Sequence, residues 1–225
     1  MKTPVKAFVQ ARMSSSRYPG KVLAPFRGEP VIVHVVRAIE CVLPSSDIVV
    51  TTSGEKSDDP LAEYLDSLGI SIYRGPLANV MKRFSSCLEQ HPCDWILRIS
   101  GDSPLLCQDL IRLVVRQAEW FNGDLVTTIF PRTFPQGQNA ELIKAGTLRS
   151  LSLMDLTPED QEHVTPYFYR HPERFSITNV ESGDRRLAGC SLAVDTVEDL
   201  QRLEGLSSED LRRFMPPIFA AEVTP

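Results

Sequence analysis

Cationic and hydroxyl side chains gather in one short stretch of this 225-residue chain, "ARMSSSRYPGK" at 11–21. It holds Arg12, Arg17 and Lys21 together with three consecutive serines, 14–16. Arginine suits bidentate contact with phosphate oxygens, and lysine acts as a compact positive charge. A tight loop also presents backbone N–H groups as a concave anion site. The stretch therefore predicts a binding site for a phosphate-bearing anion.

Two familiar phosphate motifs do not fit this stretch. Gly20-Lys21 matches the end of a P-loop, but Ser15 stands where the first glycine belongs. Val22 stands where the P-loop needs a Ser or Thr to hold Mg²⁺. No G-x-G-x-x-G follows the first apolar run, so a dinucleotide fingerprint is missing as well. A P-loop NTPase is excluded on these grounds.

Two apolar runs each lead into an aspartate, Asp102 in "ILRISGD" and Asp195 in "SLAVD". Carboxylates facing a cationic loop suit Mg²⁺ shared with phosphate oxygens. Each also has a structural interpretation: G-D-S-P is commonly a turn, and Thr196 with Asp199 forms a capping-box pattern beside Asp195. Together, beside the cationic loop, they predict one or two Mg²⁺ ions on a triphosphate.

Alternating strands and helices must position these groups. Apolar runs predict strands at 5–11, 47–53, 70–75, 94–100 and 124–129, and helical spacing predicts helices at 30–43, 59–69, 77–90 and 107–121. This order predicts a mostly parallel sheet with helices on both faces. Ligands bind at the carboxyl ends of such strands, so the loops at 11–21, 51–59 and 101–106 should converge on one cleft.

The regular alternation of strands and helices ends after residue 130. We expect a turn and an irregular strand, helices near 145–154 and 159–170, strands near 174–180 and 190–194, and a helix from Thr196. The length suits one domain over 1–225. Residues 131–185 are interpreted as a small inserted segment that shapes a second substrate's pocket.

Composition limits the partners. A net charge of −5 and a pI near 5.4 argue against a general nucleic-acid surface. Residues 1–28 nevertheless hold six cations and no acid, a local positive field that attracts small anions. Five cysteines without a CxxC pair predict reduced thiols in a cytoplasmic protein. No signal-peptide core and no long apolar run are visible, so no membrane partner is expected.

The stretch "QARMSSSRYPGKVL" resembles the signature of the SpsF-type cytidylyltransferases, Q-A-R-M-x-S-x-R-x-P-G-K-x-L, relatives of the CMP-sialate and CMP-KDO synthetases. Four further segments match in order: "DDPLAEYLDSLGISIYRG", "LRISGDSPLL", "EHVTPYFYRHPERF" and "LAVDTVEDL". The matches run from about residue 5 to residue 204. The ordered set covers most of the chain and is more specific than any one motif.

The resemblance implies a GT-A-like (Rossmann-like) α/β fold and transfer of CMP from CTP to a small acceptor, with release of pyrophosphate. It implies catalytic roles for Arg12, Arg17 and Lys21, Mg²⁺ held by Asp102 and Asp195, and a homodimer. The implied nucleotide contacts are Ala11, Arg12, Met13, Ser14, Ser15, Ser16, Lys21, Thr52, Ser53, Arg74, Ser100 and Gly101. The implied acceptor contacts are Gln138, Asn139, Glu141, His163 and Tyr167.

Two departures from the family pattern remove negative charge. Asn139 stands where the pattern has Asp, and Ala78-Asn79 replaces an Asp pair. One hypothesis is a more anionic acceptor, such as an acidic sugar or a phosphonate. The other is that these positions need only a hydrogen-bond acceptor. His163 could have a structural role, or it could bind the acceptor or form a dimer contact. No residue is assigned as a general base.

Two other functions compete with CMP transfer. A nucleotidyltransferase for another NTP usually has a more glycine-rich opening loop, whereas this loop reads A-R-M-S-S-S-R. A non-catalytic nucleotide-binding homologue could keep the cleft without turnover. The presence of both Asp102 and Asp195 argues against that alternative.

Overall fold

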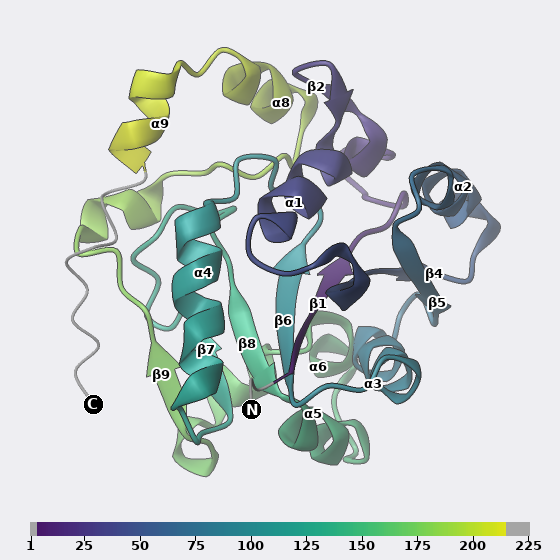
Figure 1. Cartoon of the computed structure of the whole chain (residues 1–225), viewed down its shortest axis with the longest axis vertical. Helices are drawn as coiled ribbons and strands as arrows, with labels where there is room; N and C mark the ends of the chain where they lie inside the picture. Colours follow the sequence, from purple (N-terminus) through teal and green to yellow (C-terminus); the bar gives the residue numbers. More distant parts are fainter. Residues whose placement is uncertain (1–3, 215–225) are drawn as a thin grey trace.

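A seven-stranded sheet runs through the centre of the computed structural model, which describes residues 4–214 (Figure 1). Its order is β5-β4-β1-β6-β8-β7-β9. The strands are β1 (Val5–Gln10), β4 (Ile48–Ser53), β5 (Ser71–Gly75), β6 (Trp95–Ser100), β7 (Leu125–Thr127), β8 (Glu141–Lys144) and β9 (Ile177–Asn179). Strand β8 is antiparallel to β6 and β7, and the other neighbours are parallel. The predicted mostly parallel, Rossmann-like sheet is confirmed.

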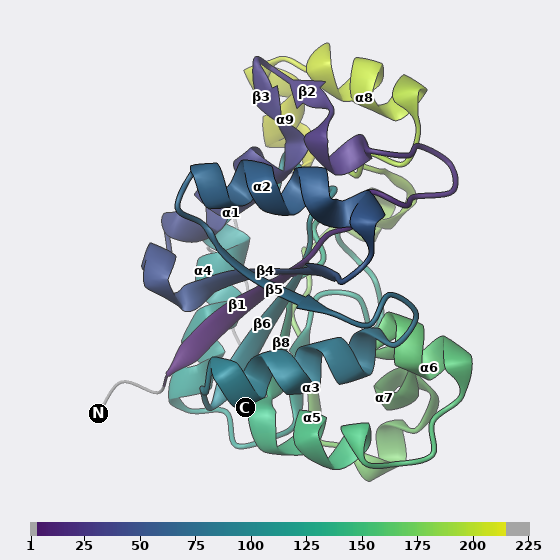
Figure 2. The same ribbon diagram turned by 90° about the vertical axis from the view of Figure 1, so that its right-hand side faces the viewer.

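Helices cover both faces of the sheet (Figure 2). On one face lie α1 (Val31–Glu40), α2 (Asp59–Ser67) and α4 (Gln108–Arg116); on the other lie α3 (Val80–Gln90) and α5 (Ala145–Ser152). Successive strand residues point to opposite faces, so each strand supplies both cores. Ala7 and Val9 pack with the α1 side, whereas Phe8 packs edge-on against Phe84 of α3, with ring centroids 5.7 Å apart.

A smaller third core lies beside the sheet. The hairpin β2 (Pro25–Phe26) and β3 (Glu29–Pro30) packs with α8 (Val197–Glu204), burying Phe26 against Leu200 and Leu203. Partly buried residues of α9 (Ser208–Phe214) pack against the same core. The hairpin follows the cationic loop, and α8 follows Asp195, so their packing holds this loop and this aspartate close together.

The segment 131–185 joins the central sheet as well as extending it. It supplies β8 and β9, α5, and two short helices, α6 (Pro158–His163) and α7 (Pro166–Arg170). The predicted single helix at 159–170 is therefore wrong. Val164 adopts a left-handed φ of +69°, and Pro166 has no N–H to continue the helix.

The predicted strand at 190–194 is also wrong. Leu192 and Val194 are buried, as the apolar pattern suggests. Their N–H groups, however, donate to the carbonyls of Gln136 and Asp102, which lie in loops, so no ladder forms. Short 3-10 turns occupy Lys21–Leu23, Ser45–Asp47, Lys56–Asp58, Gln117–Glu119, Pro172–Arg174 and Arg185–Gly189. No helix within residues 4–214 has the length and apolar character to cross a bilayer.

Candidate active site

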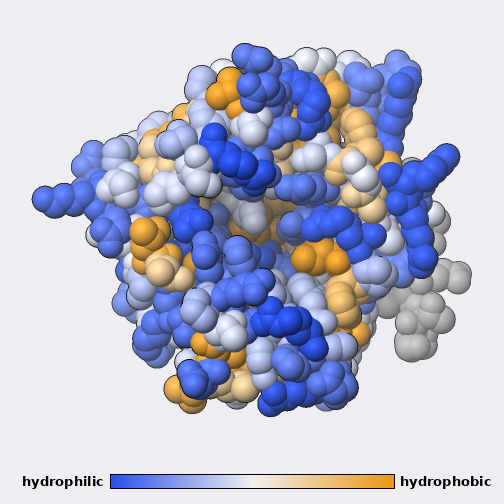
Figure 3. All heavy atoms as spheres, turned by 180° about the vertical axis from the view of Figure 1, so that it is seen from behind, coloured by the Kyte–Doolittle hydropathy of each residue, from blue (hydrophilic) through white to orange (hydrophobic). Residues whose placement is uncertain are grey.

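A cleft of about 320 Å³ opens at the carboxyl ends of β1 and β6, within the usual size range of a small-molecule site. The cationic loop and α6 project toward the same side in Figure 2, and Figure 3 shows a hollow in the middle of that face. The cleft is lined by Gln10, Ala11, Arg12, Ser15, Ser16, Arg17, Lys21, Val22, Arg98, Ser100, Asp102, Glu162, His163 and Asp195. The sheet edge therefore places the cationic loop opposite α6.

The cationic loop is closed by its own backbone. The carbonyl of Met13 accepts the N–H groups of Ser15 at 3.0 Å and Gly20 at 2.7 Å. Gly20 has φ +77°, a conformation that suits glycine because it has no Cβ. The chain then enters the 3-10 turn at Lys21, whose side chain is only 10% exposed. The loop thus returns a lysine to the floor of the cleft.

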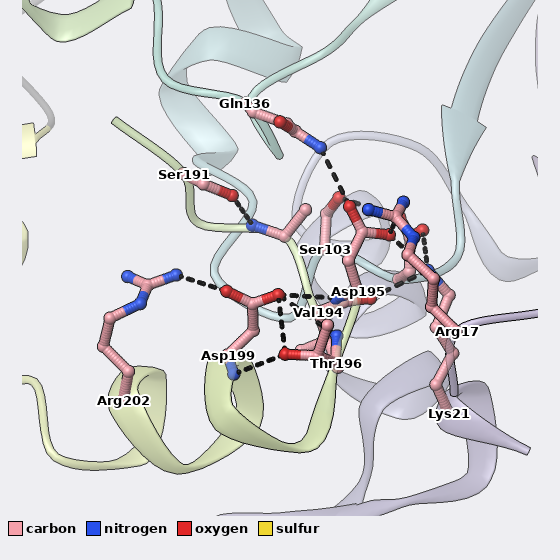
Figure 4. A network of polar contacts seen from close by, with 12 residues as sticks. Arg17, Lys21, Ser103, Gln136, Ser191, Val194, Asp195, Thr196, Asp199 and Arg202 are labelled. Carbon is pink, nitrogen blue, oxygen red and sulfur yellow. Dashed lines mark hydrogen bonds and ion pairs between the residues drawn. The ribbon is translucent and has the colours of Figure 1, made fainter. Parts of the chain in front are cut away.

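Lys21 lies between the two predicted carboxylates. Its Nζ donates to Asp102 Oδ2 at 2.7 Å, to Asp195 Oδ1 at 2.9 Å and to the Val194 carbonyl at 2.8 Å. Arg17 also reaches Asp195 Oδ1 at 2.9 Å (Figure 4). Lys21 therefore contacts two carboxylates that lie 81 and 174 positions further along the sequence. Two cations face two carboxylates in a partly desolvated site, where electrostatic interactions are stronger than in water.

The position of Asp195 is set by the start of α8. Thr196 and Asp199 form the predicted capping box, which the structure confirms. Asp199 Oδ2 accepts the backbone N–H groups of Asp195 at 3.2 Å and of Thr196 at 3.1 Å. The Val194 N–H donates to the Asp102 carbonyl at 2.9 Å. A helix cap and one backbone hydrogen bond thus place the two carboxylates side by side.

Helix α6 forms the opposite wall, and side-chain contacts join it to the cationic loop and to the start of α3. Glu162 Oε1 accepts from Arg12 Nη2 at 3.2 Å, and Gln161 Oε1 accepts from the Asn79 side chain at 3.1 Å. His163, one of the predicted acceptor contacts, lines the cleft on this wall. Sequence reasoning missed Glu162, although it directly precedes the singled-out His163.

A buried carboxylate, Asp58, joins the loops after β1 and β4. It is 0% exposed. Its Oδ1 accepts the Met13 N–H at 2.6 Å, and its Oδ2 accepts the Ser53 N–H at 3.1 Å and the Ser53 hydroxyl. Although Asp58 directly precedes α2, its side chain makes no cap hydrogen bond to that helix. Asp58 instead fixes the start of the cationic loop.

We expect Asp58→Asn to lower the free energy of unfolding by about 2–3 kcal/mol, because an amide nitrogen would then face groups that are all donors. The KM for CTP, the nucleotide that the motif resemblance implies, should rise in parallel as the loop loosens. Thermal unfolding and initial rates over a CTP titration measure the two effects. Asp66→Asn, on an exposed position of the following helix α2, is the matched control. An Asp58 variant with unchanged unfolding and unchanged KM would contradict the anchoring role.

Two arginines brace the neighbouring loops. Arg74 donates from Nε to the Ser53 carbonyl at 2.9 Å and from Nη2 to the Glu55 carbonyl at 2.8 Å. Arg83 is fully buried and donates to the Pro76 carbonyl at 2.7 Å. Burial, followed by the nearby charge of Arg12, lowers the pKa of Arg83 to about 10. Sequence reasoning missed Arg83 because an arginine in an amphipathic helix normally faces solvent.

The predicted nucleotide contacts divide into two groups. The residues that line the cleft are Ala11, Arg12, Ser15, Ser16, Lys21 and Ser100. Those that do not line it are Met13, Ser14, Thr52, Ser53, Arg74 and Gly101. Ser14 is exposed, whereas Thr52 and Ser53 are buried at the end of β4. Gly101 permits close approach, since a Cβ there would lie 2.9 Å from the Ala11 Cβ. Their roles toward a nucleotide stay predictions.

The residues predicted to contact the acceptor do not all lie in the cleft. The side-chain amide of Gln138 is buried and engaged with the Cys107 N–H and the Leu105 carbonyl. Tyr167 lines a different cavity beyond α6, and its hydroxyl accepts from Arg174. The structure therefore does not bring these two residues into the cleft, because internal partners already hold them. Glu141 is buried and accepts from Arg98 and from the Tyr169 hydroxyl.

This sheet edge presents serine hydroxyls, arginines, a buried lysine and two carboxylates to one cleft. Groups of this kind bind polyphosphates and stabilise charge on them during transfer. The fold and the site together define a nucleotidyltransferase.

Comparison with known proteins supplies the family. The chain belongs to the cytidylyltransferase family, whose sequence model matches residues 7–213. It is 31% identical to the spore coat polysaccharide biosynthesis protein SpsF of Bacillus subtilis, over 96% of this chain and 90% of that protein. A cytidylyltransferase structure from Leptospira borgpetersenii superposes with a TM-score of 0.86 at 26% identity, covering 94% of this chain and 93% of that one. A 3-deoxy-manno-octulosonate cytidylyltransferase of Chlorobium chlorochromatii is 33% identical over 55% of this chain and 49% of its own length. The resemblance seen in the motifs is confirmed.

Proposed function

We propose that this cytidylyltransferase transfers CMP from CTP to an acidic sugar, with release of pyrophosphate, in polysaccharide biosynthesis. The observation that carries the proposal is the contact of Lys21 with both Asp102 and Asp195 beside the serine-rich loop. Similarity to a spore coat polysaccharide biosynthesis protein supports the role in polysaccharide biosynthesis, and similarity to a 3-deoxy-manno-octulosonate cytidylyltransferase supports the acidic-sugar acceptor.

The reaction exchanges one bond to phosphorus for another. An acceptor hydroxyl oxygen attacks the α-phosphorus of CTP, the bond to the bridging oxygen breaks, pyrophosphate leaves, and the hydroxyl proton is lost. Negative charge grows on the phosphate oxygens and on the leaving group. In this class of reaction the protein mainly positions the reactants and stabilises that charge. Arg12, Arg17 and Lys21 line the cleft where this charge would develop.

The donor set fits Mg²⁺. Carboxylate oxygens are hard ligands, and Asp102 and Asp195 both approach Lys21 Nζ within 3 Å. Within residues 4–214 no group of three or more His, Cys, Asp or Glu side chains could hold a metal. Mg²⁺ commonly uses one or two carboxylates and takes its other ligands from phosphates and water. When bound, it would neutralise phosphate charge and acidify a coordinated hydroxyl.

Pyrophosphate release tests the proposal. The purified protein is assayed with Mg²⁺, each of CTP, UTP, GTP and ATP, and a panel of acidic and neutral sugars. We expect release with CTP and an acidic sugar. Preference for another nucleotide would favour the alternative transferase, and a thermal shift with CTP but no release would favour the non-catalytic homologue. A neutral acceptor as the best substrate would remove the acidic-sugar assignment.

The homodimer and the cytoplasmic location stay predictions. Light scattering on the eluted peak of a sizing column measures the mass of the particle against the 25.2 kDa chain.

A further inference from the structure

A short turn at the end of β7 holds Arg132 in place. Ile129 and Arg132 form an antiparallel bridge, and between them the Phe130 ring stacks on Tyr169 with centroids 4.8 Å apart. The Phe130 N–H donates to the Asn179 side chain at 3.1 Å. Arg132 therefore stands on a turn anchored to both α7 and β9, and its Nη1 donates to Asn139 Oδ1 at 2.7 Å.

Glu141 connects Arg132 with the cleft. In the β6–β8 pairing Arg98 lies opposite Glu141 and donates to its carboxylate, and Arg98 lines the cleft. Burial lowers the pKa of Arg132, and the nearby charge of Glu141 opposes this effect. Arg132 and Asn139 are not among the residues that line the cleft. The Arg132–Asn139 pair therefore lies next to the cleft, on the side of Glu141.

This side of the cleft carries one unmatched positive charge. Glu141 is paired with Arg98, and the Tyr169 hydroxyl that donates to Glu141 is neutral, with a pKa raised by burial and then by that carboxylate. Asn139 is neutral. Among residues 4–214 no carboxylate lies within the 4.0 Å ion-pair limit of Arg132. A half-buried guanidinium with five N–H donors and one neutral partner is suited to bind an anion.

We propose that Arg132 binds the acid group of the acceptor, and that the neutral Asn139 leaves its charge available for this. The inference rests on the proposed function, because it assigns one residue to recognition of that acceptor. An aspartate at 139 would neutralise Arg132 within the protein, and an acidic acceptor would lose its partner. Arg132 acts on acceptor affinity, and the triphosphate is bound at the opposite end of the cleft.

The test compares Arg132→Gln and Asn139→Asp with the unsubstituted protein. Arg149→Gln is the control, because Arg149 is exposed on α5 near Asp94 and Trp95, at the opposite end of β6. The probes are 3-deoxy-manno-octulosonate and its neutral carboxamide, each titrated at saturating CTP. Loss of a charge-assisted contact should raise the KM for the acid by about tenfold or more in both variants. The KM for the carboxamide and the KM for CTP should stay within about twofold.

Equal losses with the acid and the carboxamide would overturn the inference, and so would a raised KM for CTP. If the unsubstituted protein releases no pyrophosphate with either probe, the proposed function fails separately, and calorimetry then decides the inference. Binding of the acid to CTP-saturated protein that disappears in Arg132→Gln supports the anion site. No binding, or equal binding by both proteins, overturns it.

Discussion

Replacing Lys21 by alanine is expected to lower turnover by at least about 100-fold at saturating CTP and acceptor. This is the typical cost of removing one well-placed donor to developing negative charge. Lys21 is the cation buried most deeply in the cleft, and it contacts both carboxylates. Its loss removes a lysine that lines the cleft and leaves the negative charges of Asp102 and Asp195 less well compensated.

The fold should survive this substitution. Asp195 keeps Arg17 at 2.9 Å and the Gln136 side chain at 3.1 Å, and Asp102 keeps partial access to water. Thermal unfolding and pyrophosphate release are measured on the same preparation. Lys21→Met retains the aliphatic stem and separates loss of charge from loss of packing, and the exposed Lys56→Ala is the control. A folded Lys21→Ala protein with near-normal turnover would remove Lys21 from the mechanism.

Neutralising either carboxylate is expected to have a comparable effect. Asp102→Asn and Asp195→Asn should each lower turnover by about 100-fold or more and shift the Mg²⁺ titration to higher concentration, because an amide oxygen is a weaker ligand for a hard cation. Lys21 also competes for the same oxygens. Removing divalent cations with a chelator should abolish turnover of the unsubstituted protein, and added Mg²⁺ should restore it.

Thermal unfolding distinguishes a metal-binding role of Asp102 and Asp195 from a structural role. Each single variant leaves Lys21 with its other carboxylate and the Val194 carbonyl, so the midpoint of thermal unfolding should change little. Asp109→Asn, at an exposed position in the first turn of α4, is the control. Turnover that is independent of divalent cations, or a variant whose cation dependence matches the unsubstituted protein, would exclude the two aspartates as metal ligands.

Local patterns predicted most of the elements. The helix at α1 follows from Ile32, Val35, Val36 and Ile39, which are spaced on one face and are all buried. The misses occur where a tertiary partner overrides a pattern. Residues 190–194 alternate like a strand, but their backbone partners are loops. Val164 interrupts a helical run with a left-handed turn that its side-chain type disfavours.

The sequence by itself determined the order of strands and helices along the chain. It also determined the chemical groups of the cleft: a cationic, hydroxyl-rich loop and two aspartates that each follow an apolar run. These follow from short-range patterns and from the rule that parallel strands end at one edge. Only the tertiary structure decided that Lys21 contacts both aspartates, that Asp58 accepts from the Met13 N–H, and that Arg132 donates to the neutral Asn139. Such contacts join residues far apart in sequence, and a side chain's burial and partners depend on elements that no local pattern describes.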